Sequence, residues 1–227
     1  MVTQANTSVL VRSEAINPVF QPTTSLRKRI DRFAIRAFDL AVSGFLLLFL
    51  SPLFAAISAA VRWTSRGPAF FKQLRVMEGG KHFWVYKFRT MCKNAESLQA
   101  CVENEQKGGV IFKNKSDSRV TRVGKWLRRL SLDELPQLWN VFRGEMSLVG
   151  PRPHPVKEVD SYPTYAMERL NTKPGLTGLA QINGRSDLSF QETVTYDVDY
   201  IQRKSFWLNM WILVRTVRVV LSGKGAY

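Results

Sequence analysis

The pattern of hydrophobic and polar positions is dominated by one apolar stretch, residues 40–61, which contains no charged residue. Its 22 residues would form a helix of about 33 Å, enough to cross a hydrocarbon core of roughly 30 Å. Ser51 and Pro52 lie near the middle. Because proline lacks an N–H and clashes with the preceding turn, a kink is predicted there. The Ser51 hydroxyl is expected to bond the backbone group that Pro52 frees.

Basic residues flank this stretch on both sides: Arg27, Lys28, Arg29, Arg32 and Arg36 before it, and Arg62, Arg66, Lys72 and Arg75 after it. Lys and Arg beside a membrane segment favour the cytoplasmic side, so both ends favour the same side. Residues 27–66 are therefore predicted to form a re-entrant helix-break-helix with Ser51 and Pro52 at the membrane break. An ordinary Pro-kinked spanning helix is the alternative that these residues leave open.

Other elements follow from shorter patterns. Two aromatic-rich stretches, 69–76 and 82–89, separated by the Gly-containing residues 77–81, predict a β-hairpin. Apolar residues at positions 123, 126, 127 and 130 recur with helical spacing. Helices are predicted at residues 94–106, 123–130, 135–142 and 191–203, a loop at 108–118, and a mobile, polar tail at 1–26.

Residues 206–221 are almost wholly apolar, but Arg215 and Arg218 fall inside them. A charge in the middle of a membrane span is costly. With Trp207 and Trp211 on it, the segment is interpreted as a helix lying in the headgroup plane. The alternative is a core helix whose arginines reach water along their stems.

These elements predict an α+β fold that is mostly helical. It combines the re-entrant membrane helix, interfacial amphipathic helices, the small hairpin and one compact domain over residues 67–227, a length sufficient for its own core.

Composition adds a strong charge. Lys and Arg number 33 and Asp and Glu 18, a net charge of +15. Such an excess favours polyanionic partners, and the apolar stretch makes an anionic lipid bilayer and phosphorylated substrates better candidates than nucleic acid. The two cysteines, Cys92 and Cys101, have no second pair and no nearby histidine. They indicate neither a zinc site nor a disulfide framework, and reduced thiols are expected.

Asp133 and Glu134 are the first candidates for chemistry, because two adjacent carboxylates lie between basic segments. A carboxylate can attack phosphorus and form an acyl phosphate, and a second can hold Mg²⁺ together with substrate phosphates. The alternative is structural, since Ser131 and Glu134 have the spacing of a helix capping box. Pro136 weakens that alternative, because its missing N–H limits where the helix can start.

Several cations are also candidates. Arg152 lies between two prolines, which present its planar cation at little entropic cost, although a solvated arginine in a surface turn is the alternative. Lys87 and Arg89 alternate with aromatics and are expected on one strand face, which solvent alone would also explain. The basic positions on predicted helix 123–130 fit a solvated face, a membrane contact or a phosphate clamp: Arg122, Lys125, Arg128 and Arg129. His82 and His154 receive no role.

Four stretches taken together are far more specific. They are Tyr-Lys-Phe-Arg-Thr-Met at 86–91, Leu-Ser-Leu-Asp-Glu-Leu-Pro-Gln-Leu at 130–138, Gly-Glu-Met-Ser-Leu-Val-Gly-Pro-Arg-Pro at 144–153, and Lys-Pro-Gly-Leu-Thr-Gly-Leu-Ala-Gln-Ile-Asn-Gly-Arg at 173–185. From about residue 28 onward the chain resembles the bacterial sugar transferase family, the monotopic phosphoglycosyl transferases. It is similar to their small form, and its short ending is similar to members that handle hexoses for exopolysaccharide.

The resemblance implies an activity, a cofactor and a location. Such enzymes move a sugar-1-phosphate from a UDP-sugar to polyprenyl (undecaprenyl) phosphate and release UMP, which starts the assembly of exopolysaccharide or another glycan. By the family pattern, Asp133 is the nucleophile and Glu134 helps it hold Mg²⁺. Lys87, Arg128, Arg152 and Arg185 match the basic positions around the phosphates and nucleotide. The resemblance favours the re-entrant helix and places the catalytic domain on the cytoplasmic face of the inner membrane. A homo-oligomer is possible.

The competing hypothesis is a non-catalytic, lipid-anchored basic module that binds an acidic partner such as nucleic acid. It explains the net charge and the apolar stretch. It does not explain why two carboxylates lie within the most basic part of the chain.

Overall fold

The computed structural model describes residues 25–222, except 99–101, 103–104, 106–109, 111–113 and 115, together with residue 225. The tail predicted for residues 1–26 lies almost wholly outside the described residues, and so do parts of the predicted helix 94–106 and of the loop 108–118. Where the predicted helix is described, the chain forms turns at residues 94–98 and bends at residues 102 and 105, so the prediction is wrong there.

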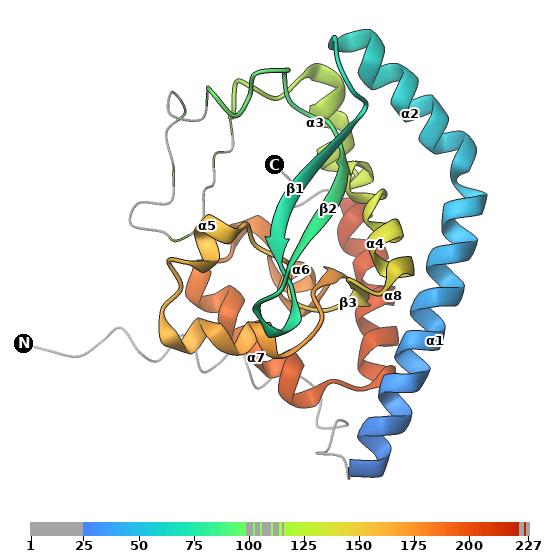
Figure 1. Ribbon diagram of the computed structural model, residues 1–227, viewed down its shortest axis with the longest axis vertical. Coiled ribbons are helices and arrows are strands. Elements are labelled where there is room, and N and C mark those ends of the chain that lie inside the picture. Colours follow the sequence, from blue (N-terminus) through green and yellow to red (C-terminus); the bar gives the residue numbers. More distant parts are fainter. Residues whose placement is uncertain are drawn as a thin grey trace, which may run out of the picture.

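The apolar stretch forms parts of two helices, α1 (Ser25–Phe49) and α2 (Ser51–Thr64), which are bent by 60° at Leu50. Figure 1 shows them along one edge of the molecule, with α2 turning away from the axis of α1. Pro52 sits in the first turn of α2, where its missing N–H costs least, so the predicted break is confirmed. The bond expected from Ser51 is not found among the described residues. Neither helix on its own is sufficiently long and apolar to cross a membrane within the described part of the chain, whereas the bent pair together satisfies length and composition.

Helix α1 is also docked onto the rest of the protein. The buried Asp39 carboxylate accepts hydrogen bonds from Ser147 Oγ (2.8 Å) and from the Leu148 N–H (3.0 Å). Arg36, expected only as a basic flank, donates to the carbonyls of Val141 and Phe142 (2.7 and 2.8 Å). These carbonyls belong to the last turn of α4 (Gln137–Arg143), where the Val141 carbonyl also accepts from the N–H of the C-cap residue Gly144 (2.9 Å). The predicted membrane segment and the predicted catalytic domain therefore share buried polar contacts.

Two small sheets position the loops. The predicted hairpin is confirmed as antiparallel β1 (Phe70–Val76) and β2 (His82–Phe88), seen in the centre of Figure 1. A second, parallel pair that the sequence patterns did not predict joins β3 (Ser147–Val149) to β4 (Gly175–Thr177). A Cβ on Gly175 would lie 2.0 Å from the Gly150 nitrogen. Glycine is therefore required where the segment after β3 passes β4.

The predicted helices at 123–130, 135–142, 191–203 and 206–221 are present with small shifts. They are α3 (Arg122–Arg129), α4, α7 (Phe190–Arg203) and α8 (Phe206–Ser222). Short elements not predicted complete the described chain: η1 (Glu78–Gly80), η3 (Leu132–Glu134), α5 (Val156–Val159), η4 (Thr164–Asn171), α6 (Leu179–Asn183) and η5 (Arg185–Asp187).

Helix α8 carries one buried face. Leu208 and Ile212 belong to the main core with Leu138 and Val141 of α4 and Val85 of β2. For this face, the alternative interpretation of residues 206–221 as a core helix is therefore correct. The opposite face leaves Trp207, Val214 and Val217 largely exposed, and its contact with a membrane stays a prediction.

Candidate active site

Asp133 and Glu134 lie on a tight turn between two helices. After α3 ends, Ser131 adopts a left-handed backbone (φ 55°), and η3 carries both carboxylates before α4 begins at Gln137. Ser131 makes no capping hydrogen bond, and its hydroxyl instead accepts one from the Arg185 guanidinium. The capping-box alternative is therefore wrong. The turn holds the two carboxylates in place for contacts with distant segments.

Glu134 is fully engaged by two cations. Lys87 Nζ donates to Oε1 (2.8 Å), while Arg152 donates through Nη2 to Oε1 (2.6 Å) and through Nη1 to Oε2 (3.0 Å). Burial of the carboxylate opposes its charge, but Arg152 and Lys87 outweigh this and hold the pKa of Glu134 well below its usual range. Glu134 is thus a permanently ionised group at neutral pH, and Arg152 is not the solvated surface arginine of the alternative.

The carboxylate of Asp133, unlike that of Glu134, is not bound by any cation in the described part of the chain. Its side chain is buried, and within the described residues no hydrogen bond or ion pair holds its carboxylate. Burial, and then the charge of Glu134, raise the pKa of Asp133, although Lys87, Arg128 and Arg152 act in the other direction. A poorly solvated carboxylate with both oxygens unengaged can serve as a nucleophile or as a metal ligand.

The two other predicted cations also lie near this turn. Arg128 Nε donates to Thr90 Oγ1 (3.0 Å). Burial lowers the pKa of Arg128, and the charge of Asp133 is the largest effect in the other direction. Arg185, on η5, reaches the turn through its bond to Ser131 and is itself in a left-handed conformation (φ 54°). The four predicted cations thus come from β2, α3, the segment after β3, and η5.

The remaining basic candidates point elsewhere. Arg89 lies outside this cluster, because its Nη2 donates to the carbonyl and hydroxyl of Ser65 (2.6 and 2.9 Å) just after α2. Solvation therefore does not explain Lys87 or Arg89. Of the basic positions on α3, only Arg128 turns inward, whereas Arg122, Lys125 and Arg129 are exposed.

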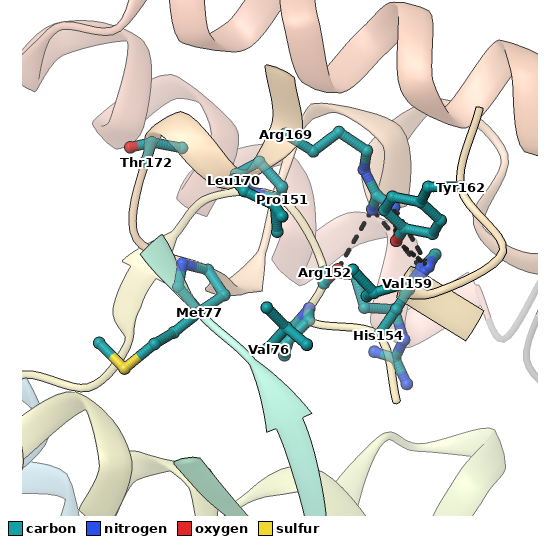
Figure 2. A pocket seen from close by; sticks show the side chains of 12 residues that line it. Val76, Met77, Pro151, Arg152, His154, Val159, Tyr162, Arg169, Leu170 and Thr172 are labelled. Atoms are coloured by element: carbon teal, nitrogen blue, oxygen red, sulfur yellow. Dashed lines mark hydrogen bonds between the residues drawn. The ribbon is translucent and has the colours of Figure 1, made fainter. Parts of the chain in front are cut away.

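Sequence reasoning missed a polar network behind Arg152. Arg169 of η4 and Asp197 of α7 form a buried ion pair (2.7 Å), and Arg169 also contacts the ring of His154 and the hydroxyl of Tyr162. Figure 2 shows the side chains of Arg169, His154 and Tyr162 converging beside the loop that carries Arg152. No local pattern marks them, since each position is compatible with a surface residue in its own segment.

The donor set for Mg²⁺ is small. No group of three or more His, Cys, Asp or Glu side chains in the described part of the chain is arranged to hold a metal ion. Asp133 offers two unengaged oxygens, and Glu134 shares its own with Lys87 and Arg152. Mg²⁺ commonly binds one or two carboxylates together with substrate phosphates. The residues fit the ion if a phosphorylated substrate supplies the other ligands.

Asp133 has no hydrogen-bond partner among the described residues, the neighbouring Glu134 is paired with cations, and the four cations around them come from different elements. This arrangement fits a transferase site for a phosphorylated substrate. Comparison with known proteins agrees. A family model described as bacterial sugar transferase matches residues 30–223. The chain belongs to the bacterial sugar transferase family, and it is an enzyme of the phosphoglycosyl transferase class. The hypothesis of a non-catalytic basic module is therefore wrong.

Individual relatives differ in length. The exopolysaccharide production protein ExoY of Rhizobium meliloti (strain 1021) is 38% identical over 219 residues, covering 94% of this chain and 97% of ExoY. The UDP-glucose:undecaprenyl-phosphate glucose-1-phosphate transferase of Klebsiella pneumoniae is 42% identical over 226 residues, 95% of this chain and 46% of that protein. The undecaprenyl-phosphate galactose phosphotransferase of Salmonella typhimurium (strain LT2) is 41% identical over 208 residues, which cover 89% of this chain and 44% of that protein. The chain thus spans nearly all of ExoY and less than half of the other two.

Proposed function

We propose that this enzyme transfers a sugar-1-phosphate from a UDP-hexose to undecaprenyl phosphate, giving undecaprenyl-diphosphate-sugar and UMP, and so starts the assembly of an exopolysaccharide or another glycan. The names of the Klebsiella and Salmonella relatives support the acceptor and the type of transfer. The name of the Rhizobium relative supports the exopolysaccharide role.

The observation that carries the proposal is the difference between two neighbouring carboxylates. Glu134 is bound by Arg152 and Lys87, whereas Asp133 has no hydrogen-bond partner among the described residues. Asp133 is therefore proposed as the nucleophile. One of its oxygens attacks the phosphorus that bears the sugar, the bond from that phosphorus to the UMP oxygen breaks, and UMP leaves with the electron pair. The product is a phosphosugar-aspartate.

The second half of the reaction regenerates the enzyme. A phosphate oxygen of undecaprenyl phosphate attacks the same phosphorus, and Asp133 departs as a carboxylate. Lys87, Arg128, Arg152 and Arg185 surround the turn with positive charge and would bind the diphosphate of the donor. When bound by Asp133 and Glu134, Mg²⁺ would neutralise charge on the phosphates.

We also propose a membrane location, with both ends of the α1–α2 pair at the cytoplasmic face. Large apolar side chains on these helices are exposed, among them Phe45, Leu48, Phe49 and Trp63. Single cysteines at positions 20 and 66, in a background without Cys92 and Cys101, should both resist an impermeant thiol reagent in intact cells. Labelling at position 20 alone would indicate a spanning helix.

The test of the reaction is UMP release by the purified protein. A panel of UDP-sugars is incubated with undecaprenyl phosphate and Mg²⁺, and UMP is measured for the wild type, for Asp133→Asn and for Asp160→Asn. Asp160 is an exposed aspartate outside the site and is the matched control. We expect turnover by the wild type and the control, and none by Asp133→Asn, because an amide cannot form the acyl phosphate. Substantial UMP release by Asp133→Asn would falsify the assignment.

A further inference from the structure

Arg169 is buried, with 3% of its surface exposed, and it uses its whole guanidinium. Nε donates to Asp197 Oδ2 (2.7 Å), Nη1 donates to the Tyr162 hydroxyl (2.6 Å), and Nη2 donates to the main-chain carbonyl of Arg152 (3.2 Å). The His154 ring also lies against it, with Nδ1 at 3.1 Å from Nη1. Figure 2 shows the bonds that join Arg169 to Tyr162, His154 and the main chain of Arg152. Arg169 thus ties η4 and α7 to the main chain of a candidate site residue.

The loop carrying Arg152 has its own restraints. Pro151 and Pro153 fix the backbone on both sides, and the Val76 N–H donates to the carbonyl of His154 (3.2 Å). Only the Arg152 side chain projects outward, with 40% of its surface exposed, to meet Glu134. Its reach therefore depends on where its main chain is held, and Arg169 holds the carbonyl of that same residue.

The space behind the loop does not fit a ligand. The cavity lined by Arg152, His154, Tyr162 and Arg169 has a volume of about 10 Å³, which admits at most a single water molecule. The buried cation is instead matched by a buried anion, because Asp197 is 1% exposed. The cluster is thus a packed support for the loop and not a second binding site.

We propose that Arg169 is a positioning residue for the transferase reaction: it holds the main chain of Arg152 so that the Arg152 guanidinium meets both Glu134 and the phosphates of the donor. This inference rests on the proposed function. An arginine is required because its planar fork donates in three directions at once, to Asp197, Tyr162 and the Arg152 carbonyl. A lysine keeps the charge opposite Asp197 but loses that geometry.

The test is a double-mutant cycle on UMP release. Arg169→Lys should fold and lose roughly ten- to one-hundred-fold in kcat, since a displacement of about 1 Å at a reacting centre has effects of that size. In an Arg152→Ala background the same change should have little further effect, because the side chain that it positions is gone. A merely structural role would lower kcat by the same factor in both backgrounds, and that result would overturn the proposal. So would full activity of Arg169→Lys.

Two further variants keep the result interpretable. Ile212→Val trims the buried core of α8 and should lower the melting temperature without changing kcat below it. If Arg169→Lys does not fold, Tyr162→Phe removes a single partner of Arg169 and should give a smaller loss that again disappears in the Arg152→Ala background. Equal losses in both backgrounds would again refute the positioning role.

The failure of this inference is distinct from failure of the proposed function. If the wild type releases UMP but the cycle shows no coupling, only the role of Arg169 is wrong. If the wild type releases no UMP from any UDP-sugar, the proposed function is wrong. The same cycle is then measured by urea unfolding, where coupled effects of positions 152 and 169 support the positioning of the Arg152 side chain against Glu134, and additive effects refute it.

Discussion

Replacing each of the two adjacent carboxylates by its amide should change stability in opposite directions. Burial and the charge of Glu134 raise the pKa of Asp133 in the folded protein. Ionised Asp133 therefore destabilises the fold at pH 7, and Asp133→Asn removes that effect. Ionised Glu134 instead stabilises the fold, because Arg152 and Lys87 hold its pKa well below the usual range. Glu134→Gln leaves these two cations without their anion.

The size of each stability change follows from the exposure and the contacts of the groups involved. For Asp133→Asn we expect a gain of about 1 kcal/mol, within the range of single stabilising changes, or roughly 2–4 °C in melting temperature for a protein of this size. Glu134 accepts three charge-assisted bonds, but Arg152 is 40% exposed, so solvent screening reduces their contribution. We expect Glu134→Gln to lose about 2 kcal/mol, or roughly 4–8 °C.

The pH dependence gives a second check. Below the unfolded pKa of aspartate, about 3.9, Asp133 is protonated in both states and the variant has no advantage. As pH rises through that value, the folded wild type resists losing the proton, and the advantage of Asp133→Asn grows until pH exceeds the folded pKa. The stabilisation from Glu134 is present above its unfolded pKa, about 4.3, and is lost as pH falls through the folded value.

The assay is thermal unfolding of the two variants and the wild type in detergent, with EDTA present so that no divalent cation binds Asp133, at several pH values. Asp160→Asn is the control and should change little. If Asp133→Asn lowers the melting temperature at pH 7 as Glu134→Gln does, the unpartnered, desolvated state of Asp133 is refuted.

Three other predictions concern the surroundings of the site. Arg152→Lys should lose part of the UMP-forming activity and Arg152→Ala most of it. Arg152→Ala should also melt a few degrees lower because Glu134 loses two hydrogen bonds. An unfolded Arg152→Ala protein would mean that this arginine is mainly structural. Asp39→Ala should cost about 1–3 kcal/mol in urea unfolding, since the Ser147 hydroxyl and Leu148 N–H lose their buried acceptor; an unchanged midpoint would contradict the docking of α1. Pro52→Ala should allow α1 and α2 to continue as one helix, which cysteine labelling at position 20 would detect; unchanged protection would mean that the proline does not enforce the bend.

Local order in this protein was readable from the sequence. The hairpin, the four later helices and the break at Pro52 each depend on periodicity or on a turn residue within about a dozen positions. The motif around Asp133 and Glu134 also marked the candidate site, as did the prolines around Arg152. The family match supports the class of enzyme that these motifs implied.

Tertiary structure alone decided how these residues divide their roles. Lys87 and Arg152 lie 47 and 18 positions from Glu134, and nothing local determines that they bind it and leave Asp133 without a hydrogen bond. Arg89, two positions from Lys87, instead turns to Ser65. Such pairings depend on how whole elements pack, and the sequence pattern of one segment contains no information about its neighbour in space. The network of Arg169 was invisible for the same reason.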